Sequence, residues 1–153
     1  MSIVNQRALA RVAGERGQAL LETAFVLPII LLVSIGIFEF GRAYQTVQVI
    51  TNAAREGARV AVLPNATTDD VKSRVTAYLK AGQVKYDDTV VVDVDQASSI
   101  SIGGANASAS VVTVKYPFEF MVMHQAVSLV ASKSKLGDPL TLTAKAEMRN
   151  ESN

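Results

Sequence analysis

The chain has 153 residues, 49% of them hydrophobic, and a formal net charge of +1. A charge so close to neutral, with Lys and Arg scattered along the chain, gives no reason to expect a nucleic-acid partner. There is no cysteine, so packing alone must stabilise any domain, even in an oxidising compartment.

Residues 1–17 form a short basic leader that ends in glycine. Three arginines, Arg7, Arg11 and Arg16, stand against a single acid, Glu15. By the positive-inside tendency, this end of the chain stays in the cytoplasm. The sequence after the first apolar run is then expected outside the membrane.

That apolar run extends from Ala19 to Phe38, and its only ionisable side chain is Glu22. As a helix these residues cover about 30 Å, the thickness of a bilayer's hydrocarbon core, which predicts one membrane-spanning helix. The run is too long for a cleaved secretory signal, and the sequence after it continues in helical pattern. Pro28 either kinks the helix or is one of the prolines that membrane helices commonly tolerate.

Helical periodicity continues past the membrane to about Val62, and Pro64 ends it, so residues 18–62 are predicted to form one long helix. Small residues in its outer part allow close approach of another element, namely Ala54, Gly57, Ala58 and Ala61. Three charged residues point elsewhere: Arg55, Glu56 and Arg59. They form either a solvated face with a Glu56–Arg59 pair or a contact with a partner subunit or with the chain's own C-terminal strand.

The sequence pattern of residues 63–153 predicts a small α+β domain. Thr67 or Thr68 is expected to cap a second helix, with Asp69 and Asp70 in its first turn and Gly82 at its end. Strands are predicted at 89–94, 111–117 and 140–148, with a long hairpin connection over 96–110 that includes a short strand at 99–102. The fold class is therefore α+β, with a long N-terminal helix and a three- or four-stranded antiparallel sheet.

The residue types that could carry chemistry do not form a recognisable site. Asp93 and Asp95 share a strand face, but the loop spacing of a calcium motif is absent, so we expect polar side chains on an open face and no metal. His124 is the only histidine, and no G-x-S-x-G nucleophile motif accompanies it. Gly103 and Gly104 read as a turn rather than a phosphate loop. We expect no catalytic residue, no enzyme activity and no cofactor.

An apolar cluster lies between the second and last predicted strands, in a segment read as a short helix or an exposed loop. It comprises Phe118, Phe120, Met121, Val122 and Met123. If these side chains are exposed, they form a partner-binding surface; if they are buried, they close the core of the small domain.

The start of the apolar run resembles a type IV prepilin, because residues 18–21 are uncharged and Glu22 is the fifth residue after Gly17. Several further motifs together resemble the TadE-like family, pilin-like proteins of the tight-adherence (Flp) pilus machinery. They are Pro28, Phe38-Glu39-Phe40-Gly41-Arg42 and Ala53-Ala54-Arg55-Glu56-Gly57-Ala58-Arg59, with a weaker likeness in the C-terminal strand at 146–149.

This resemblance implies a cut between Gly17 and Gln18 by a prepilin peptidase, so that removing 17 of 153 residues leaves 136. It also implies that Glu22 sets helix register by pairing with the new N-terminal amine of a neighbouring subunit; otherwise Glu22 simply snorkels to water. One departure bears on processing: Thr23 follows Glu22, where pilins of this pathway usually carry an aromatic residue.

The implied function is that of a minor pilin or pseudopilin in tight-adherence type IV pilus biogenesis, acting in assembly or as a filament or tip subunit. The implied location is a bacterial cytoplasmic (inner) membrane with the C-terminal domain outside, or an extracellular pilus. Partners would be other pilins or pseudopilins, the pilus assembly membrane platform, prepilin peptidase and membrane lipid. The alternative is a single-pass anchored module that binds or displays a ligand and enters no filament. A membrane-tethered hydrolase is disfavoured by the solitary His124.

Overall fold

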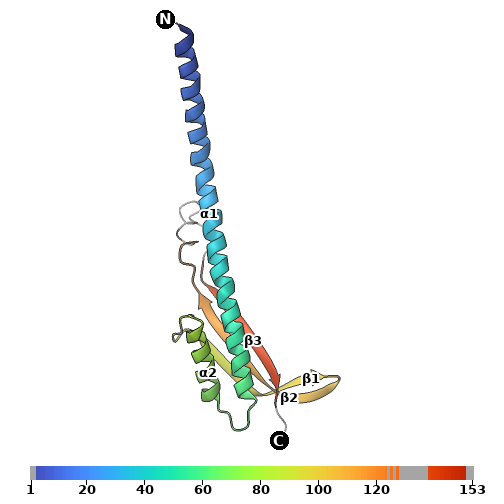
Figure 1. Cartoon of the computed structure of the whole chain (residues 1–153). Coiled ribbons are helices and arrows are strands. Elements are labelled where there is room, and N and C mark those ends of the chain that lie inside the picture. The colour runs from blue at the N-terminus through green and yellow to red at the C-terminus, as the bar shows by residue number, and fades with distance from the viewer. Residues whose placement is uncertain (1–2, 124, 126, 128–137, 151–153) are drawn as a thin grey trace.

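The computed structural model describes residues 3–123, 125, 127 and 138–150. In chain order its elements are α1 (Ile3–Ala61), α2 (Thr68–Ala81), β1 (Val91–Ile102), β2 (Ala105–Phe118) and β3 (Leu140–Arg149). α1 projects as a long rod, and the other elements gather around its C-terminal half (Figure 1). The predicted α+β class, with a second helix and an antiparallel sheet, is confirmed.

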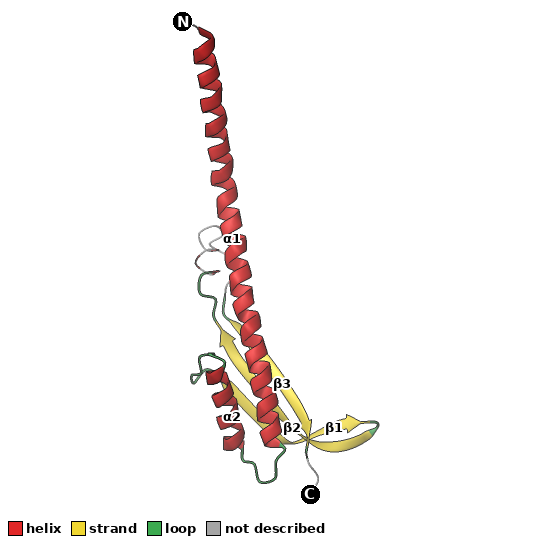
Figure 2. Cartoon of the chain, in the orientation of Figure 1, coloured by secondary structure: helices red, strands yellow, loops and turns green. Residues whose placement is uncertain are grey.

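α1 is a single helix of 59 residues that continues through Pro28 without interruption (Figure 2). It begins at Ile3, well before the predicted start, because the leader is rich in good helix formers such as Ala, Arg, Gln and Leu and contains no proline. It ends at Ala61, shortly before Pro64. Among the described residues, α1 holds the one segment long and apolar enough to cross a membrane.

α2 begins with the cap that the sequence predicts. Thr67 is the N-cap; its hydroxyl accepts a hydrogen bond from Asp70 N at 3.2 Å. The Asp70 carboxylate accepts one from Thr67 N at 3.0 Å. This reciprocal capping box satisfies two backbone donors that the first helical turn leaves open. Gly82 follows the last helical residue, as expected.

The sheet has the order β1-β2-β3, with both pairs antiparallel. The predicted hairpin and the strand at 99–102, which is the end of β1, are confirmed, but the long connection over 96–110 is wrong. Both strands continue through it, and only Gly103 and Gly104 remain as a turn. Their φ angles of +59° and +85° suit a two-residue hairpin turn. A register shift between Asp95 and Ser98 interrupts the pairing. Beyond it, the paired ends of β1 and β2 project from the body of the domain (Figure 1).

One face of the sheet packs against α1 and α2. Small residues bring α1 close to its neighbours: Ala53, Ala54 and Ala58 are fully buried. A Cβ added at Gly57 would lie only 2.6 Å from Val75 Cγ2. The predicted close approach is confirmed. Other core residues come from α2, β2 and β3, among them Val71, Val75, Leu79, Val112, Val114, Leu142, Ala144 and Ala146.

The other face of the sheet is open and largely polar. Asp93 and Asp95 are exposed on β1, where strand alternation places them. Asp95 Oδ1 accepts a hydrogen bond from Ala97 N at 3.0 Å. This contact stabilises the irregularity from which the projecting hairpin starts.

A polar cluster joins that irregularity to the end of α1. Gln96 Nε2 donates hydrogen bonds to the carbonyl oxygens of Ala61 and Ala66, at 3.2 and 3.1 Å. The buried Ser110 hydroxyl lies 3.2 Å from the same Ala61 oxygen. The last carbonyl groups of a helix have no partner within the helix, so these side chains satisfy them and tie the sheet to α1.

Candidate functional site

The first ionisable residue after the apolar run, Glu39, is completely buried. Its Oε1 accepts a hydrogen bond from the backbone N of Val122 at 2.7 Å, and its Oε2 accepts one from Arg42 Nη2 at 3.0 Å. Residues three apart on a helix are neighbours on its surface, so α1 itself presents Glu39 and Arg42 together. The contact with Val122 joins residues 83 positions apart.

Arg42 makes two further contacts with the end of β2. It donates a hydrogen bond to the carbonyl oxygen of Glu119, and its guanidinium carbon lies 4.5 Å from the centre of the Phe118 ring. Arg42, Glu39, Phe118, Glu119 and Val122 thus form one unit, which we call the helix–strand clamp. It holds the chain after β2 against α1 at the point where the helix leaves its apolar stretch.

The clamp makes a buried carboxylate tolerable. Removing a carboxylate from water is costly unless a counter-charge and hydrogen bonds replace the lost solvation. Here Arg42 supplies the counter-charge, and the Val122 amide satisfies the second oxygen. As a result, the domain can begin directly beside the apolar helix, without a linker between them.

The predicted apolar cluster divides into two parts. Phe118 and Met123 are buried and close the core, whereas Met121 and Val122 are 62% and 45% exposed. Phe120 is half-buried, and its ring stands edge-on to that of Phe118 at a centroid distance of 5.2 Å. The core interpretation is therefore confirmed for Phe118 and Met123, whereas partner binding by the exposed Met121 and Val122 stays a prediction.

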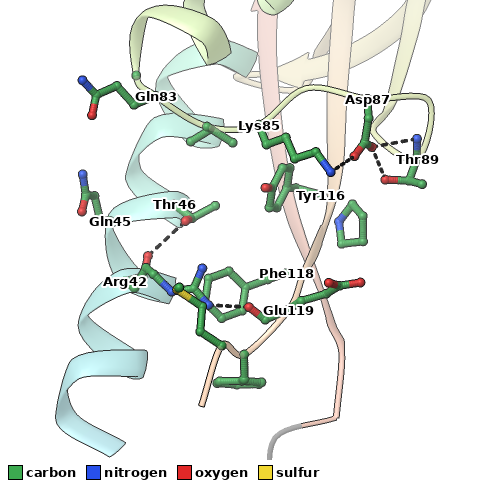
Figure 3. Close-up of a pocket in the computed structure, with 15 residues that line it drawn as sticks. Arg42, Gln45, Thr46, Gln83, Lys85, Asp87, Thr89, Tyr116, Phe118 and Glu119 are labelled. Carbon is green, nitrogen blue, oxygen red and sulfur yellow. Dashed lines mark hydrogen bonds and ion pairs between the residues drawn. The ribbon is translucent and has the colours of Figure 1, made fainter. Parts of the chain in front are cut away.

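A cleft of about 650 Å³ lies beside the clamp, between α1, the segment after α2 and the end of β2 (Figure 3). Asp87 accepts hydrogen bonds from the hydroxyl and backbone N of Thr89 and lies 3.2 Å from Lys85 Nζ. The hydrogen bonds from the Thr89 hydroxyl and amide hold the pKa of Asp87 below its ordinary value, and the contact with Lys85 contributes less in the same direction. Burial, reinforced by the Asp87 charge, raises the pKa of Tyr116. Lys85, Asp87 and Thr89 bond to one another, which stabilises the wall of the cleft.

Glu22 is exposed on α1, among the residues that line a groove on the helix surface. The groove is otherwise lined by Ala19, Thr23, Val26, Leu27, Ile30 and Leu31. Within the described part of the chain, no hydrogen bond or ion pair reaches the Glu22 carboxylate. Its role in register stays a prediction.

Gly17 and Gln18 both lie within α1 and are exposed. The bond predicted to be cut is therefore helical backbone, and a peptidase would have to unwind it locally. Space around Gly17 is open, since an added Cβ would meet no atom within 4 Å. Processing at this bond stays a prediction.

The charged motif in the outer part of α1 joins the two helices. Glu56 Oε2 lies 3.0 Å from Arg74 Nη2 on α2, and Glu56 Oε1 lies 3.3 Å from Arg59 Nη1. The predicted Glu56–Arg59 pair is confirmed, and Arg74 is a partner that the sequence did not reveal. Arg55 is exposed, and contact of this motif with another subunit remains a prediction.

Sequence reasoning singled out Phe38–Arg42 as a motif but assigned no role to Glu39 or Arg42. The available signal was an acid directly after an apolar run with an arginine three positions later. Their partners come from the segment after β2, which could be read equally as helix or loop. His124, the only candidate base, lies outside the described residues.

Comparison with known proteins gives one result for the anchor helix. Residues 17–59 match the family model described as TadE-like protein, while no curated protein and no solved structure matches the chain. The matched range contains Glu22, Pro28, both clamp residues of α1 and the motif at 53–59, but not β3, where a weaker likeness was expected. Similarity to this family indicates a pilin-like component associated with tight-adherence pili. The long N-terminal helix of this chain is thus similar to that of TadE-like proteins.

Proposed function

We propose that this chain is a membrane-anchored, pilin-like component of tight-adherence pilus biogenesis, a minor pilin or pseudopilin that acts in assembly or as a filament or tip subunit. One observation carries the proposal: the TadE-like segment is an unbroken helix that passes from the apolar run directly into the domain core. Ala53, Ala54 and Ala58 of that helix are core residues, so the domain must follow any axial movement of the anchor. In this proposal the protein has no catalytic role.

In the proposed topology the basic leader lies in the cytoplasm and the domain lies outside. After cleavage by a prepilin peptidase, the amine of Gln18 would pair with Glu22 of a neighbouring subunit. A carboxylate inside a membrane costs a few kcal/mol unless it finds a partner. Glu22 and Gln18 are about 6 Å apart along the helix axis, so pairing would stagger neighbouring helices by a defined step.

Processing is tested by the intact mass of the membrane-extracted protein, expressed with and without a cognate prepilin peptidase. We expect residues 1–17 to be lost only when the peptidase is present. Gly17→Val should block the cut, whereas Gly36→Val should not. The two variants are matched, because a Cβ at either glycine meets no atom within 4 Å. A full-length mass under both conditions would favour the permanently anchored binding or display module instead.

Assembly is tested by placing a photo-reactive amino acid at Val26, in the Glu22 groove, and at Ser99, on the projecting hairpin. In cells that assemble the pilus, the Val26 probe should cross-link to other pilins within the membrane. Cross-links from Ser99 alone would indicate that the anchor does not bundle. The absence of pilin cross-links at both positions would contradict a place in the filament or its assembly complex.

A further inference from the structure

Exposed apolar side chains gather at the end of the domain nearest the apolar helix. Phe40 comes from α1, Met121 and Val122 follow β2, and Leu140 opens β3; all four are exposed. Leu140 is the register partner of Phe118, which places both strands at the same end of the sheet. We call these four residues the apolar collar.

The clamp fixes the height of the collar along α1. Val122 N is bonded to Glu39, the residue that directly follows the last position of the apolar run. The half-buried Phe120 ring stands edge-on to Phe40 at a centroid distance of 6.3 Å. In Figure 1 the end of β2 lies beside α1 on the side of the domain facing the N-terminal rod. If α1 spans the bilayer with Ala19–Phe38, the collar lies at the membrane surface.

We propose that the collar is a second membrane contact, in which Met121 and Val122 insert between the lipid headgroups of the leaflet from which the domain emerges. This proposal requires that α1 spans a membrane but not that the chain enters a pilus. The occupant is lipid because the collar continues the apolar surface of the spanning helix, with Phe38 and Phe40 exposed where the two meet. Aromatic and apolar side chains are favoured at this depth.

The two charges that α1 places beside the collar fit the same location. Glu39 is fully buried and paired, so it presents no bare carboxylate to the lipid. The Arg42 side chain is 32% exposed, and a partly exposed guanidinium at this level can reach the lipid phosphates. One helix alone leaves a domain free to tilt on the membrane. A second contact away from the helix axis restrains that tilt.

The test uses the full chain, which has no cysteine of its own. Met121→Cys and Val122→Cys are labelled with an environment-sensitive fluorophore and reconstituted in vesicles of phosphatidylcholine and phosphatidylglycerol. Ser99→Cys, on the projecting hairpin, is the distal control. Tyr44→Cys lies on an exposed part of α1, about 9 Å beyond Phe38 along the helix axis. It controls for the distance of a probe from the membrane, because it is near the collar in height but is not part of it. All four side chains are exposed, so the labels should leave the fold intact, which far-UV circular dichroism verifies.

We expect the probes at 121 and 122 to be quenched by a nitroxide near the top of the lipid acyl chains. Their quenching by aqueous iodide should be on the order of tenfold weaker than at position 99, because an ion does not enter the apolar layer. Iodide quenching as strong at 121 and 122 as at 99 would overturn the proposal. So would shielding from both quenchers that grows with the protein-to-lipid ratio, since that result means a second copy covers the collar.

Discussion

Replacing Glu39 tests the clamp most directly. Glu39→Ala removes both acceptor oxygens, so the buried side of Arg42 loses its counter-charge and the Val122 amide loses its partner. Glu39→Gln has nearly the same shape and keeps an acceptor for that amide but removes the charge. The two variants therefore separate the hydrogen bond from the ion pair.

The size of the effect follows from burial. Breaking a fully buried ion pair costs about 3–5 kcal/mol, and a hydrogen bond to a charged group contributes about 1.5–3 kcal/mol. Arg42 is one-third exposed and keeps its contacts with Glu119 and Phe118, so the lower end applies. We expect Glu39→Ala to destabilise the domain by about 2–3 kcal/mol and Glu39→Gln by about 1 kcal/mol. For a domain of roughly 100 residues, the alanine variant should lower the thermal midpoint by about 8–12 °C.

The assay is thermal unfolding in detergent micelles, followed by circular dichroism, together with hydrogen exchange across residues 118–123. The Val122 amide should exchange at least about tenfold faster in Glu39→Ala, because its hydrogen bond is lost. Glu119→Ala is the control: its side chain is exposed, and Arg42 contacts only its backbone oxygen. If Glu39→Ala unfolds like Glu119→Ala and Val122 stays protected, the clamp does not hold the strand to the helix.

Three further predictions concern separate parts of the molecule. Gly57→Ala should destabilise the domain by about 1–3 kcal/mol through overpacking, while Gly41→Ala, with open space around its Cβ, should be neutral or stabilising by about 0.5–1 kcal/mol in the same thermal assay. The hydroxyl and amide of Thr67 hold the pKa of Asp70 below its ordinary value, so this stabilisation is present above about pH 4 and is lost as pH falls through the folded pKa. The thermal midpoint of the wild type should accordingly fall toward that of Asp70→Asn in acid, and a constant difference between them would contradict the linkage. Glu22→Gln should lower co-purification with other pilins about tenfold, corresponding to about 1.4 kcal/mol, and unchanged recovery would exclude the role in register.

Local patterns predicted the parts of the fold that local physics decides. The apolar periodicity of α1, the capping residues of α2 and the alternation in β3 are all visible in single segments. Thr67 and Asp70, for example, specify a helix start through contacts spanning three residues. The packing of Gly57 and the neighbouring alanines against α2 and the sheet could be expected for the same reason, since small side chains are what close approach requires.

Segments decided by distant contacts were harder to predict. Residues 98–109 carry small Ser, Ala and Asn side chains with little intrinsic preference for strands, yet they pair because the Gly103–Gly104 turn folds one strand directly onto the other. The bonds from Gln96 to Ala61 and Ala66 depend on where the irregularity in β1 falls. Neither feature follows from the periodicity of its own segment.

The different roles of Glu22 and Glu39 could not be distinguished from the sequence. Both are carboxylates at the edges of the same apolar run, and each could be read as a charge that snorkels or finds a partner. The structure distinguishes them: Glu39 is buried and satisfied by Arg42 and Val122 within one chain, whereas Glu22 is exposed, with no partner in the described residues. Only the carboxylate left without a partner can lower its free energy when helices associate. The search for contacts between subunits should therefore begin at Glu22, and Glu39 should be treated as a residue that positions the domain.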